Sequence, residues 1–328
     1  MNSHEYLTPI NGILTPIAEI KKLLATKELF IFDLDGTLFN TLGDLAPAVN
    51  YALKQFGVRE ISKENVRSCI GNGSKNLIRR SVASGLMFAA GKSAGEPIAG
   101  KSRAEHLDVR DNEAVAAVLE SAGFDDAKID EVHKVYSAYY WEHCTENTEP
   151  YESVVEIIRR INATGIADTG CSTIAEARCA AKKIAAMLTN KPVNPAKKIL
   201  EKFGLIGNSK NCGATADENR SESTSKNRPA DLISAYLCGD TTPERKPSPA
   251  GIFALLQQTG IAPEKAVMIG DDMPDVLAAK NAGIDCITLL EGFGRPENLL
   301  PLEPKYTAGH IKDFAELITP SKDTFQQR

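Results

Sequence analysis

The sequence predicts an α/β protein whose parallel sheet is interrupted, after its first strand, by an all-helical unit. The apolar run Leu29–Phe32, which ends in a turn signal, indicates a short buried strand. The following block, 42–148, has helical periodicity and no convincing strand, whereas strands and helices alternate after Pro150. Strands that alternate with helices of this length indicate βαβ units and a parallel sheet covered on both faces. The predicted core therefore comes from two separate stretches of the chain.

A chain of 328 residues favours about two domains. The predicted bounds are 1–27 for an N-terminal extension, 28–41 together with 149–328 for the α/β core, and 42–148 for the helical unit. Within the extension, Pro16–Leu24 is predicted to form a short amphipathic helix. Three further segments lack a clear period or are rich in polar residues, and we expect them to be flexible insertions: 85–104, 166–182 and 206–230.

The remaining elements follow from apolar periodicity and from helix-stop signals. In the helical unit the predicted helices are 44–56, Ser74–Ser84, Asn112–Ser121 and Lys128–His143. In the core the predicted strands are Ile184–Thr189, Ala235–Cys238, Ala266–Ile269 and Cys286–Leu290. The predicted core helices are Ser153–Ala163, Pro195–Phe203, Pro249–Gln258, Asp275–Asn281 and Ile311–Leu317.

Composition excludes several classes of protein. A net charge of −5 and a pI near 5.7 give no basic footprint for nucleic acid or for an anionic membrane. No apolar run has the length needed to span a bilayer, and Met1–Lys27 lacks the pattern of a secretory signal. Seven cysteines, without a C-x-x-C pair, indicate reduced thiols and a cytoplasmic protein. The sequence leaves open whether the protein is a monomer or a homodimer.

Two carboxylates follow the first predicted strand directly. Asp33 and Asp35 are two residues apart, so their side chains point the same way, and Gly36 lets the chain turn sharply. Two adjacent acids repel each other, which favours a cation or an incoming electrophile beside them. An EF-hand is excluded because its glycine stands at loop position 6, whereas Gly36 is fourth counting from Asp33. Taken alone, the segment is equally consistent with a plain Asp-Gly turn.

Polar residues also follow the next predicted strands. They are Thr189-Asn190-Lys191 after the second strand, Gly239-Asp240 and then Arg245–Pro249 after the third, and Gly270–Asp275 after the fourth. Singly, these residues could be helix caps or solvated charges. Because ligands of open parallel sheets bind at the carboxyl edge of the strands, their common position predicts one site.

These residue types suit phosphoryl transfer. A carboxylate that attacks a phosphate dianion about 4 Å away, at an effective dielectric of about 20, meets roughly 8 kcal/mol of repulsion. Such repulsion alone slows a reaction about a million-fold, so the site needs positive charge. Asp33, Asp271 and the backbone oxygen of Asp35 suit Mg²⁺, and Lys246 adds a fixed cation. An aspartate nucleophile would form an aspartyl-phosphate, and Asp35 would move protons.

The motifs D-x-D-G-T at Asp33–Thr37 and G-D-x-x-x-D at Gly270–Asp275, with Thr189 and Lys246, resemble those of the haloacid dehalogenase-like hydrolase superfamily. They are most similar to its phosphoglycolate phosphatase branch, and the likeness covers most of 28–318. The resemblance implies a Rossmann-like parallel sheet core with an inserted all-helical cap, here 42–148, which covers the site and selects the substrate.

The resemblance also implies roles for single residues. Asp33 would be the nucleophile and Asp35 the acid/base, with Thr189 and Lys246 completing the catalytic set. The implied phosphate ligands are Thr189, Asn190, Lys246 and Gly36; the implied metal ligands are Asp33, Asp35 and Asp271; and Asp272 and Asp275 would support the site. The implied reaction is Mg²⁺-dependent hydrolysis of a small phosphorylated metabolite, such as 2-phosphoglycolate.

Two alternatives use the same core. A dehalogenase lacks an acid at the position of Asp35, but a β-phosphoglucomutase-like phosphotransferase and a non-catalytic scaffold that binds Mg²⁺ and phosphate both remain open. The cap loop Ile70-Gly71-Asn72-Gly73 matches the phosphoglycolate phosphatase branch, although a simple turn also explains it. A substrate carboxylate would require a cation from the cap, for which Lys75 and Arg79 are candidates; either could equally be an exposed charge on a helix.

Overall fold

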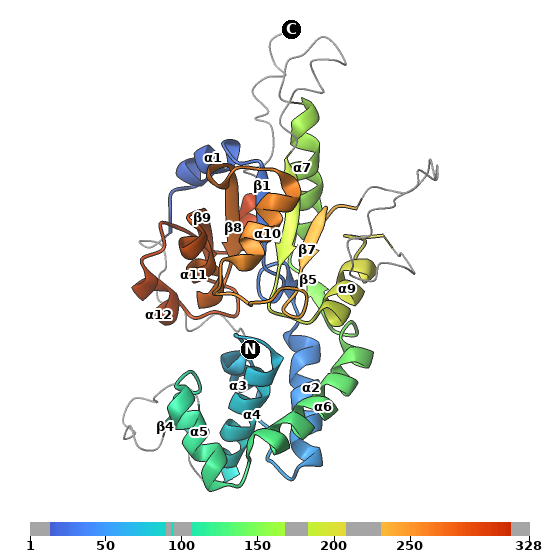
Figure 1. Ribbon diagram of the computed structural model, residues 1–328, viewed down its shortest axis with the longest axis vertical. Helices are drawn as coiled ribbons and strands as arrows, with labels where there is room; N and C mark the ends of the chain where they lie inside the picture. Colours follow the sequence, from blue (N-terminus) through green and yellow to red (C-terminus); the bar gives the residue numbers. More distant parts are fainter. Residues whose placement is uncertain (1–13, 90–92, 95–105, 168–182, 208–230, 316–328) are drawn as a thin grey trace, which may run out of the picture.

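The computed structural model describes residues 14–89, 93–94, 106–167, 183–207 and 231–315. The predicted fold class is confirmed: an α/β unit with a parallel sheet lies above a helical unit that follows the first strand (Figure 1). Most of the three predicted insertions, 85–104, 166–182 and 206–230, lies outside the described residues.

The core is a six-stranded sheet of order β10-β9-β8-β1-β6-β7, and every neighbouring pair is parallel. Its strands are β1 (Leu29–Phe32), β6 (Ile184–Leu188), β7 (Ala235–Leu237), β8 (Ala266–Gly270), β9 (Asp285–Leu289) and β10 (Tyr306–Ala308). All the ends of the five strands that were predicted lie within one residue of the prediction, whereas the short edge strand β10 was missed. Because all strands run the same way, their carboxyl ends meet at one edge of the sheet.

Helices cover both faces of the sheet, and β1 shows why. Phe30 and Phe32 point to one face and Leu29 and Ile31 to the other, as the two-residue period of a strand requires. The first face packs against α1 (Ile17–Ala25), α7 (Val154–Ala167) and α9 (Val193–Lys202). The second packs against α10 (Ala250–Thr259) and α11 (Met273–Ala282). With both faces buried, β1 is apolar at every position, and for this reason it could be predicted from the sequence.

The helical unit, which we call the cap, has its own hydrophobic core. Its helices are α2 (Leu42–Gln55), α3 (Lys63–Cys69), α4 (Ser74–Ala89), α5 (Asn112–Ser121) and α6 (Asp126–His143). In Figure 1, the cap lies below the sheet, and its helices α2 and α6 run side by side. One detail differs from the all-helical expectation: β3 (Ser93–Ala94) and β4 (His106–Leu107) form a two-residue parallel pair.

Three predicted helices differ from the structure by more than two residues at one end. Helix α4 continues past Ser84 to Ala89, and Gly85 lies inside it, where a Cβ would lie 2.5 Å from the carbonyl oxygen of Arg59 and glycine therefore allows the close approach. Helix α7 continues through Gly165 to Ala167, because a glycine near a helix end is tolerated at modest cost. The final predicted helix is a 3-10 turn, η5 (Ile311–Phe314). The cap helix α3 was not predicted, nor were the short elements η3 (Pro263–Lys265), α12 (Pro296–Leu299) and η4 (Leu300–Leu302).

The two chain segments that join core and cap lie side by side. Strand β2 (Phe39–Asn40) pairs antiparallel with β5 (Glu149–Pro150). Next to this pair, the buried carboxylate of Asp44 accepts hydrogen bonds from the backbone and side-chain amides of Asn147 and from the backbone N–H of Thr148. The junction is therefore fixed by a buried charge with three donors.

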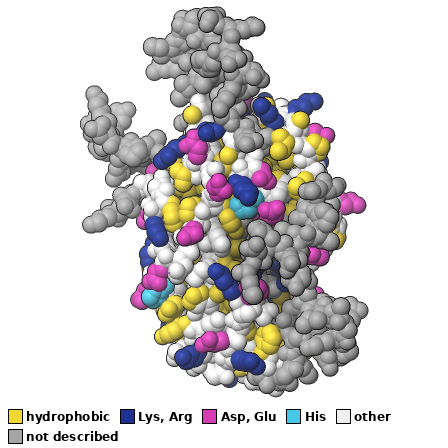
Figure 2. Space-filling model, turned by 180° about the vertical axis from the view of Figure 1, so that it is seen from behind, with side chains coloured by type: hydrophobic (Ala, Val, Ile, Leu, Met, Phe, Trp, Pro, Cys, Tyr) yellow, Lys and Arg dark blue, Asp and Glu magenta, His cyan; other side chains and the backbone are white. Residues whose placement is uncertain are grey.

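The surface mixes charges of both signs. Acidic and basic side chains are interspersed over the described part of the face seen in Figure 2. Among the described residues, no helix combines the length and the apolar character required to cross a membrane.

Replacing Asp44 with alanine should lower the free energy of unfolding by about 3 kcal/mol, because three donors lose a charged acceptor at a buried position. Urea unfolding followed by circular dichroism measures the change. Asp111→Ala is the matched control: Asp111 is exposed and caps α5 through two backbone N–H groups, so its loss should cost about 1 kcal/mol. Equal effects of the two substitutions would contradict the role given to Asp44.

Candidate active site

The predicted strand ends meet at a cavity of about 320 Å³ between the carboxyl edge of the sheet and the cap. It is lined by nearly all of the predicted site residues from both units: Asp33, Asp35, Thr189, Asn190, Lys246, Asp271, Asp272, Asp275, Gly71, Asn72 and Gly73. Lys75 and Arg79 are not among the lining residues. Gly36 is not among them either, although it lies against Asp271.

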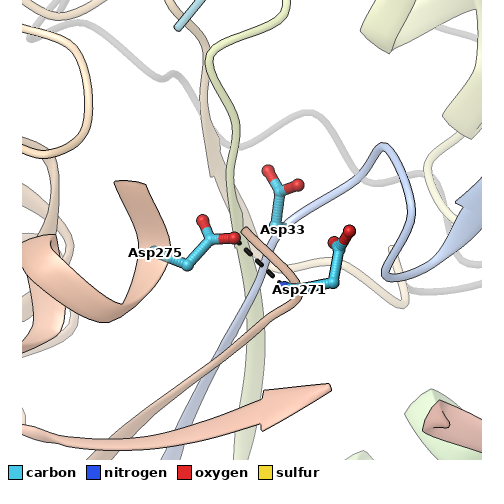
Figure 3. A group of neighbouring side chains, drawn as sticks. All are labelled: Asp33, Asp271 and Asp275. Carbon is cyan, nitrogen blue, oxygen red and sulfur yellow. Dashed lines mark hydrogen bonds between the residues drawn. The ribbon is translucent and has the colours of Figure 1, made fainter. Parts of the chain in front are cut away.

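Three aspartates form the acidic centre of the site. The carboxylates of Asp33, Asp271 and Asp275 are buried, and one oxygen of each lies within 4.8 Å of the others (Figure 3). Burial raises the pKa of Asp33 to about 7, and burial with the nearby Asp33 carboxylate raises the pKa of Asp271 well above its usual value. Carboxylates crowded in this way favour a cation, and their hard oxygen donors suit a divalent metal ion. The group can therefore hold a metal.

Lys246 places a positive charge inside this acidic centre. Its ammonium donates to Asp33 Oδ1 at 2.6 Å, to Asp275 Oδ1 at 2.6 Å and to the Leu188 carbonyl at 2.7 Å. Burial lowers the pKa of Lys246, but the two carboxylates outweigh burial and hold it above its usual value. All three N–H groups are used, so Lys246 is a fixed cation tied to Asp33.

Asn190 holds the segment that carries Lys246. Its side-chain oxygen accepts from the Lys246 backbone N–H at 3.0 Å, and its side-chain nitrogen donates to the Lys246 carbonyl at 2.9 Å. The predicted role of Asn190 was to bind phosphate. Binding through this side chain would require breaking both bonds, so these contacts give the side chain a positioning role, and phosphate binding by the Asn190 backbone N–H stays a prediction. The neighbouring Thr189 is buried at the cavity wall, where its hydroxyl oxygen accepts from the Lys191 N–H.

Three hydrogen-bond donors of the core hold the Asp271 carboxylate. One oxygen accepts from the Thr37 hydroxyl at 2.5 Å, and the other accepts from the backbone N–H groups of Phe293 and Gly294. Gly36 lies against the same carboxylate with φ +90°, and a Cβ there would stand 2.3 Å from its oxygen. The glycine of the D-x-D-G-T motif is therefore required by backbone conformation and by close approach. The Gly292-Phe293-Gly294 turn, left open by the sequence, belongs to the site.

Asp272 and Asp275 form the start of α11. Asp272 caps the helix, and Asp275 Oδ2 accepts from the backbone N–H groups of Asp271 and Asp272. Figure 3 shows the Asp271 bond, which ties the acidic centre to the helix end. Asp272 also pairs with the cap residue Arg110 at 3.2 Å. One aspartate thus orders the centre and the other links it to the cap.

Asp35 is separate from the acidic centre and has a different set of partners. Its carboxylate accepts from Lys191 Nζ at 2.9 and 3.1 Å and from the Thr41 hydroxyl at 2.6 Å. The predicted contribution of Asp35 to a metal was its backbone oxygen, and that remains a prediction. Lys191 follows a predicted strand, but its sequence position does not tell which carboxylate it meets, so the sequence assigns it no role.

The cap contributes the loop Gly71–Gly73 but not the predicted cations. A Cβ at Gly71 would lie 2.6 Å from Asp272 Oδ2, and one at Gly73 would lie 2.6 Å from Arg245, so the loop closely contacts the core. Lys75 is paired with Asp130 at 2.5 Å, and Arg79 is paired with Asp126; both acids lie on α6. These pairs direct the two cations along the cap surface, which does not favour a role in substrate binding.

Comparison with known proteins gives a family match over most of the chain. Residues 27–283 match the family model described as haloacid dehalogenase-like hydrolase. A phosphoglycolate phosphatase from Psychrobacter arcticus is 27% identical over 89% of this chain and 94% of its own length. One from Pseudomonas putida is 28% identical over 82% of this chain and 72% of its own.

A solved structure has a similar fold. The crystal structure described as a predicted phosphoglycolate phosphatase from Haemophilus somnus aligns with a TM-score of 0.60 at 24% identity. The alignment covers 90% of this chain and 99% of that one. At this identity the similarity concerns the arrangement of core and cap.

Replacing Lys246 with methionine should lower the free energy of unfolding by about 3–5 kcal/mol, because it leaves Asp33 and Asp275 buried without their cation. Urea unfolding at neutral pH measures the loss. Lys265→Met is the matched control: Lys265 is half exposed and pairs with Glu28 at 3.5 Å, so its substitution should cost less than about 1 kcal/mol. A Lys246 variant as stable as the control would contradict the buried ion-pair network.

Proposed function

Because this chain belongs to the haloacid dehalogenase-like hydrolase family, we propose that it hydrolyses a small phosphate monoester through an aspartyl-phosphate on Asp33. The observation that carries the proposal is the position of Asp33. It follows the central strand β1, lines the cavity, and is bound by the buried Lys246 beside two further carboxylates. A carboxylate so placed has positive charge next to it, which attack on a phosphate dianion requires.

The proposed cofactor is Mg²⁺. Asp33, Asp271 and the backbone oxygen of Asp35 would hold it, with Asp275 ordering Asp271 through its backbone N–H. Bound there, the ion would neutralise charge on the transferring phosphoryl group. The donor set supports the fit: burial raises the pKa of both Asp33 and Asp271, and Thr37, Phe293 and Gly294 hold the Asp271 carboxylate in place.

Asp33 is proposed as the nucleophile. Lys246 binds Oδ1, so we assign the attack to Oδ2, which forms a bond to phosphorus while the bond to the ester oxygen breaks. The product is an aspartyl-phosphate and an alcohol. Water then attacks the same phosphorus, releasing inorganic phosphate and restoring the Asp33 carboxylate. Thr189, buried at the cavity wall, would hydrogen-bond a phosphate oxygen.

Asp35 is proposed to move the protons. It would give a proton to the departing ester oxygen and take one from the attacking water in the second step, so the cycle leaves it unchanged. Lys191 and Thr41 fix its carboxylate at the edge of the cavity. The spacing of Asp33 and Asp35 places both on one side of the chain, yet Asp33 pairs with Lys246 and Asp35 pairs with Lys191.

The proposed substrate is 2-phosphoglycolate or a close analogue. Support comes from the names of the relatives, from the cap loop Gly71–Gly73 at the cavity wall, and from a cavity of about 320 Å³, at the small end for ligand sites. A screen of phosphate release from 2-phosphoglycolate, sugar phosphates, nucleotides and pyrophosphate tests it. Conversion of β-glucose 1-phosphate to glucose 6-phosphate without phosphate release would instead indicate the phosphotransferase.

Asp33→Asn should lower kcat for phosphate release by at least about 10⁴-fold, because the amide cannot act as nucleophile. The loss of kcat caused by Asp35→Asn should depend on the leaving group of the substrate. The loss should be about 10²- to 10⁴-fold for alkyl phosphates, whose oxygen needs a proton, and much smaller for p-nitrophenyl phosphate. Equal losses on both substrates would contradict the proton role of Asp35, and an active Asp33→Asn variant would contradict the covalent mechanism.

Removing divalent cations with a chelator should abolish activity, and adding Mg²⁺ should restore it. Mg²⁺ at about 100 times its dissociation constant should also stabilise the folded protein by about 2.7 kcal/mol, measured by thermal unfolding. Asp271→Asn should lose this stabilisation. Asp240→Asn is the control: Asp240 lines the cavity but accepts from the Val193 N–H outside the acidic centre, so it should keep the stabilisation. Unchanged Mg²⁺ binding in Asp271→Asn would exclude the proposed ligand.

A further inference from the structure

A substrate that carries a carboxylate besides its phosphate needs a second cation in the site. Six aspartates line the cavity, and among its described lining residues the basic side chains are Lys191 and Lys246. The three N–H groups of Lys246 are committed to Asp33, Asp275 and Leu188. Lys75 and Arg79, on the cap, pair with α6 and do not line the cavity. Lys191 is therefore the described cation best placed for a second anionic group.

Lys191 lies between the core and the cap. Its side chain is only 4% exposed, and its ammonium binds both oxygens of a single partner, Asp35. The same ammonium lies over the ring of Tyr140, 4.7 Å from the centroid. Tyr140 belongs to α6 of the cap and lines the same cavity. Lys191 thus contacts the proposed acid/base on one side and the cap on the other.

Tyr140 carries a second feature of a binding site. Its hydroxyl is buried and has no hydrogen-bond partner among the described residues. A buried hydroxyl without a partner costs free energy, which a ligand oxygen could recover. Burial also raises the pKa of Tyr140 well above its usual value, so the hydroxyl stays neutral and can donate.

The position of Asp35 links these residues to one part of the substrate. Asp35 is assigned to the ester oxygen, and Lys191 is bound to Asp35. In a 2-phospho acid, a single carbon separates the ester oxygen from the carboxyl group. A carboxylate in that position comes next to the groups that surround Asp35, which are Lys191 and Tyr140, rather than next to Lys246.

We infer that Lys191, together with the Tyr140 hydroxyl, forms the subsite that selects substrates with a carboxylate beside the phosphate ester. This inference rests on the proposed phosphatase function and names the residues that would determine its specificity. The ammonium would be shared between Asp35 and the substrate carboxylate, and the phenol would donate to the same carboxylate. A substrate with a neutral alcohol would find only the Asp35–Lys191 pair and would gain nothing from the subsite.

The test compares 2-phosphoglycolate with 2-hydroxyethyl phosphate, which has a similar size and an equally poor leaving group but no carboxylate. Lys191→Met should lower kcat/KM for 2-phosphoglycolate at least about tenfold more than for 2-hydroxyethyl phosphate, mainly through KM, because one charge-assisted contact is lost. Lys191→Arg should recover part of the preference. Tyr140→Phe, which removes one oxygen, should reduce the same ratio by about threefold or more.

Lys198→Met is the matched control. Lys198 is another core lysine that contacts α6, through the carbonyls of Trp141 and Glu142, but it does not line the cavity. Its substitution should leave the ratio of the two substrates unchanged. Inhibition by phosphonoacetate, compared with inhibition by inorganic phosphate, measures binding without turnover. Lys191→Met should weaken inhibition by phosphonoacetate much more than inhibition by inorganic phosphate.

Two outcomes separate the inference from the proposed function. If Lys191→Met lowers kcat/KM equally for both substrates, Lys191 only positions Asp35. The proposed subsite is then overturned, while the proposed phosphatase function stands. If the unmodified protein releases phosphate from neither compound nor from any other ester, the proposed function itself has failed. Should Lys191→Met not fold, Tyr140→Phe and the phosphonoacetate comparison decide: an unchanged substrate ratio in Tyr140→Phe overturns the subsite.

Discussion

The buried contact of Lys246 with Asp33 and Asp275 is the interaction on which the rest of the site depends. Carboxylates that lie this close in a dry interior repel each other, and a single ammonium with three partners compensates two of them. The surrounding residues preserve that arrangement. Asn190 fixes the backbone of Lys246 by two hydrogen bonds, and Asp275 is held in turn by the first turn of α11. Because Asp33, Asn190, Lys246 and Asp275 follow four different strands, the parallel sheet itself determines the geometry of the centre.

The cap is joined to this centre by polar contacts around the rim and by one aromatic residue. Arg110 of the cap pairs with Asp272, and Arg295 of the core donates to Ser68 of the cap at 2.6 Å. Phe293 connects the two units directly: its ring lies in the hydrophobic cluster of the cap, while its N–H donates to Asp271. A shift of the cap would therefore move Phe293 and change its hydrogen bond to Asp271, a candidate metal ligand. Together with the Asp44 junction, these contacts place the cavity at the interface of two separately packed units.

Much of the fold and most of the acidic centre could be predicted from the sequence, and for a physical reason. Short strands buried on both faces are apolar at every position, so β1, β6 and β8 were recognised, and the residues after them had to meet at one edge. The edge strand β10 and the pair β2–β5 were missed because two or three residues show no period. Lys191 and Tyr140 were missed because their meeting depends on how the cap packs on the core, which local pattern does not encode.

The two aspartates of the D-x-D motif have different partners, and the proposed difference in their roles rests on these partners. Asp33 lies with Lys246 in the acidic centre, where burial raises its pKa and a cation is favoured. Asp35, two residues later, pairs instead with Lys191 and Thr41, and the Lys191 ammonium lies over the ring of the cap residue Tyr140. In the proposed function, Lys246 serves the part of the site that handles phosphate, and Lys191 serves the part that meets the rest of the substrate. Since the second lysine is the one in contact with the cap, substrate selection at Lys191 would depend on how the cap packs on the core.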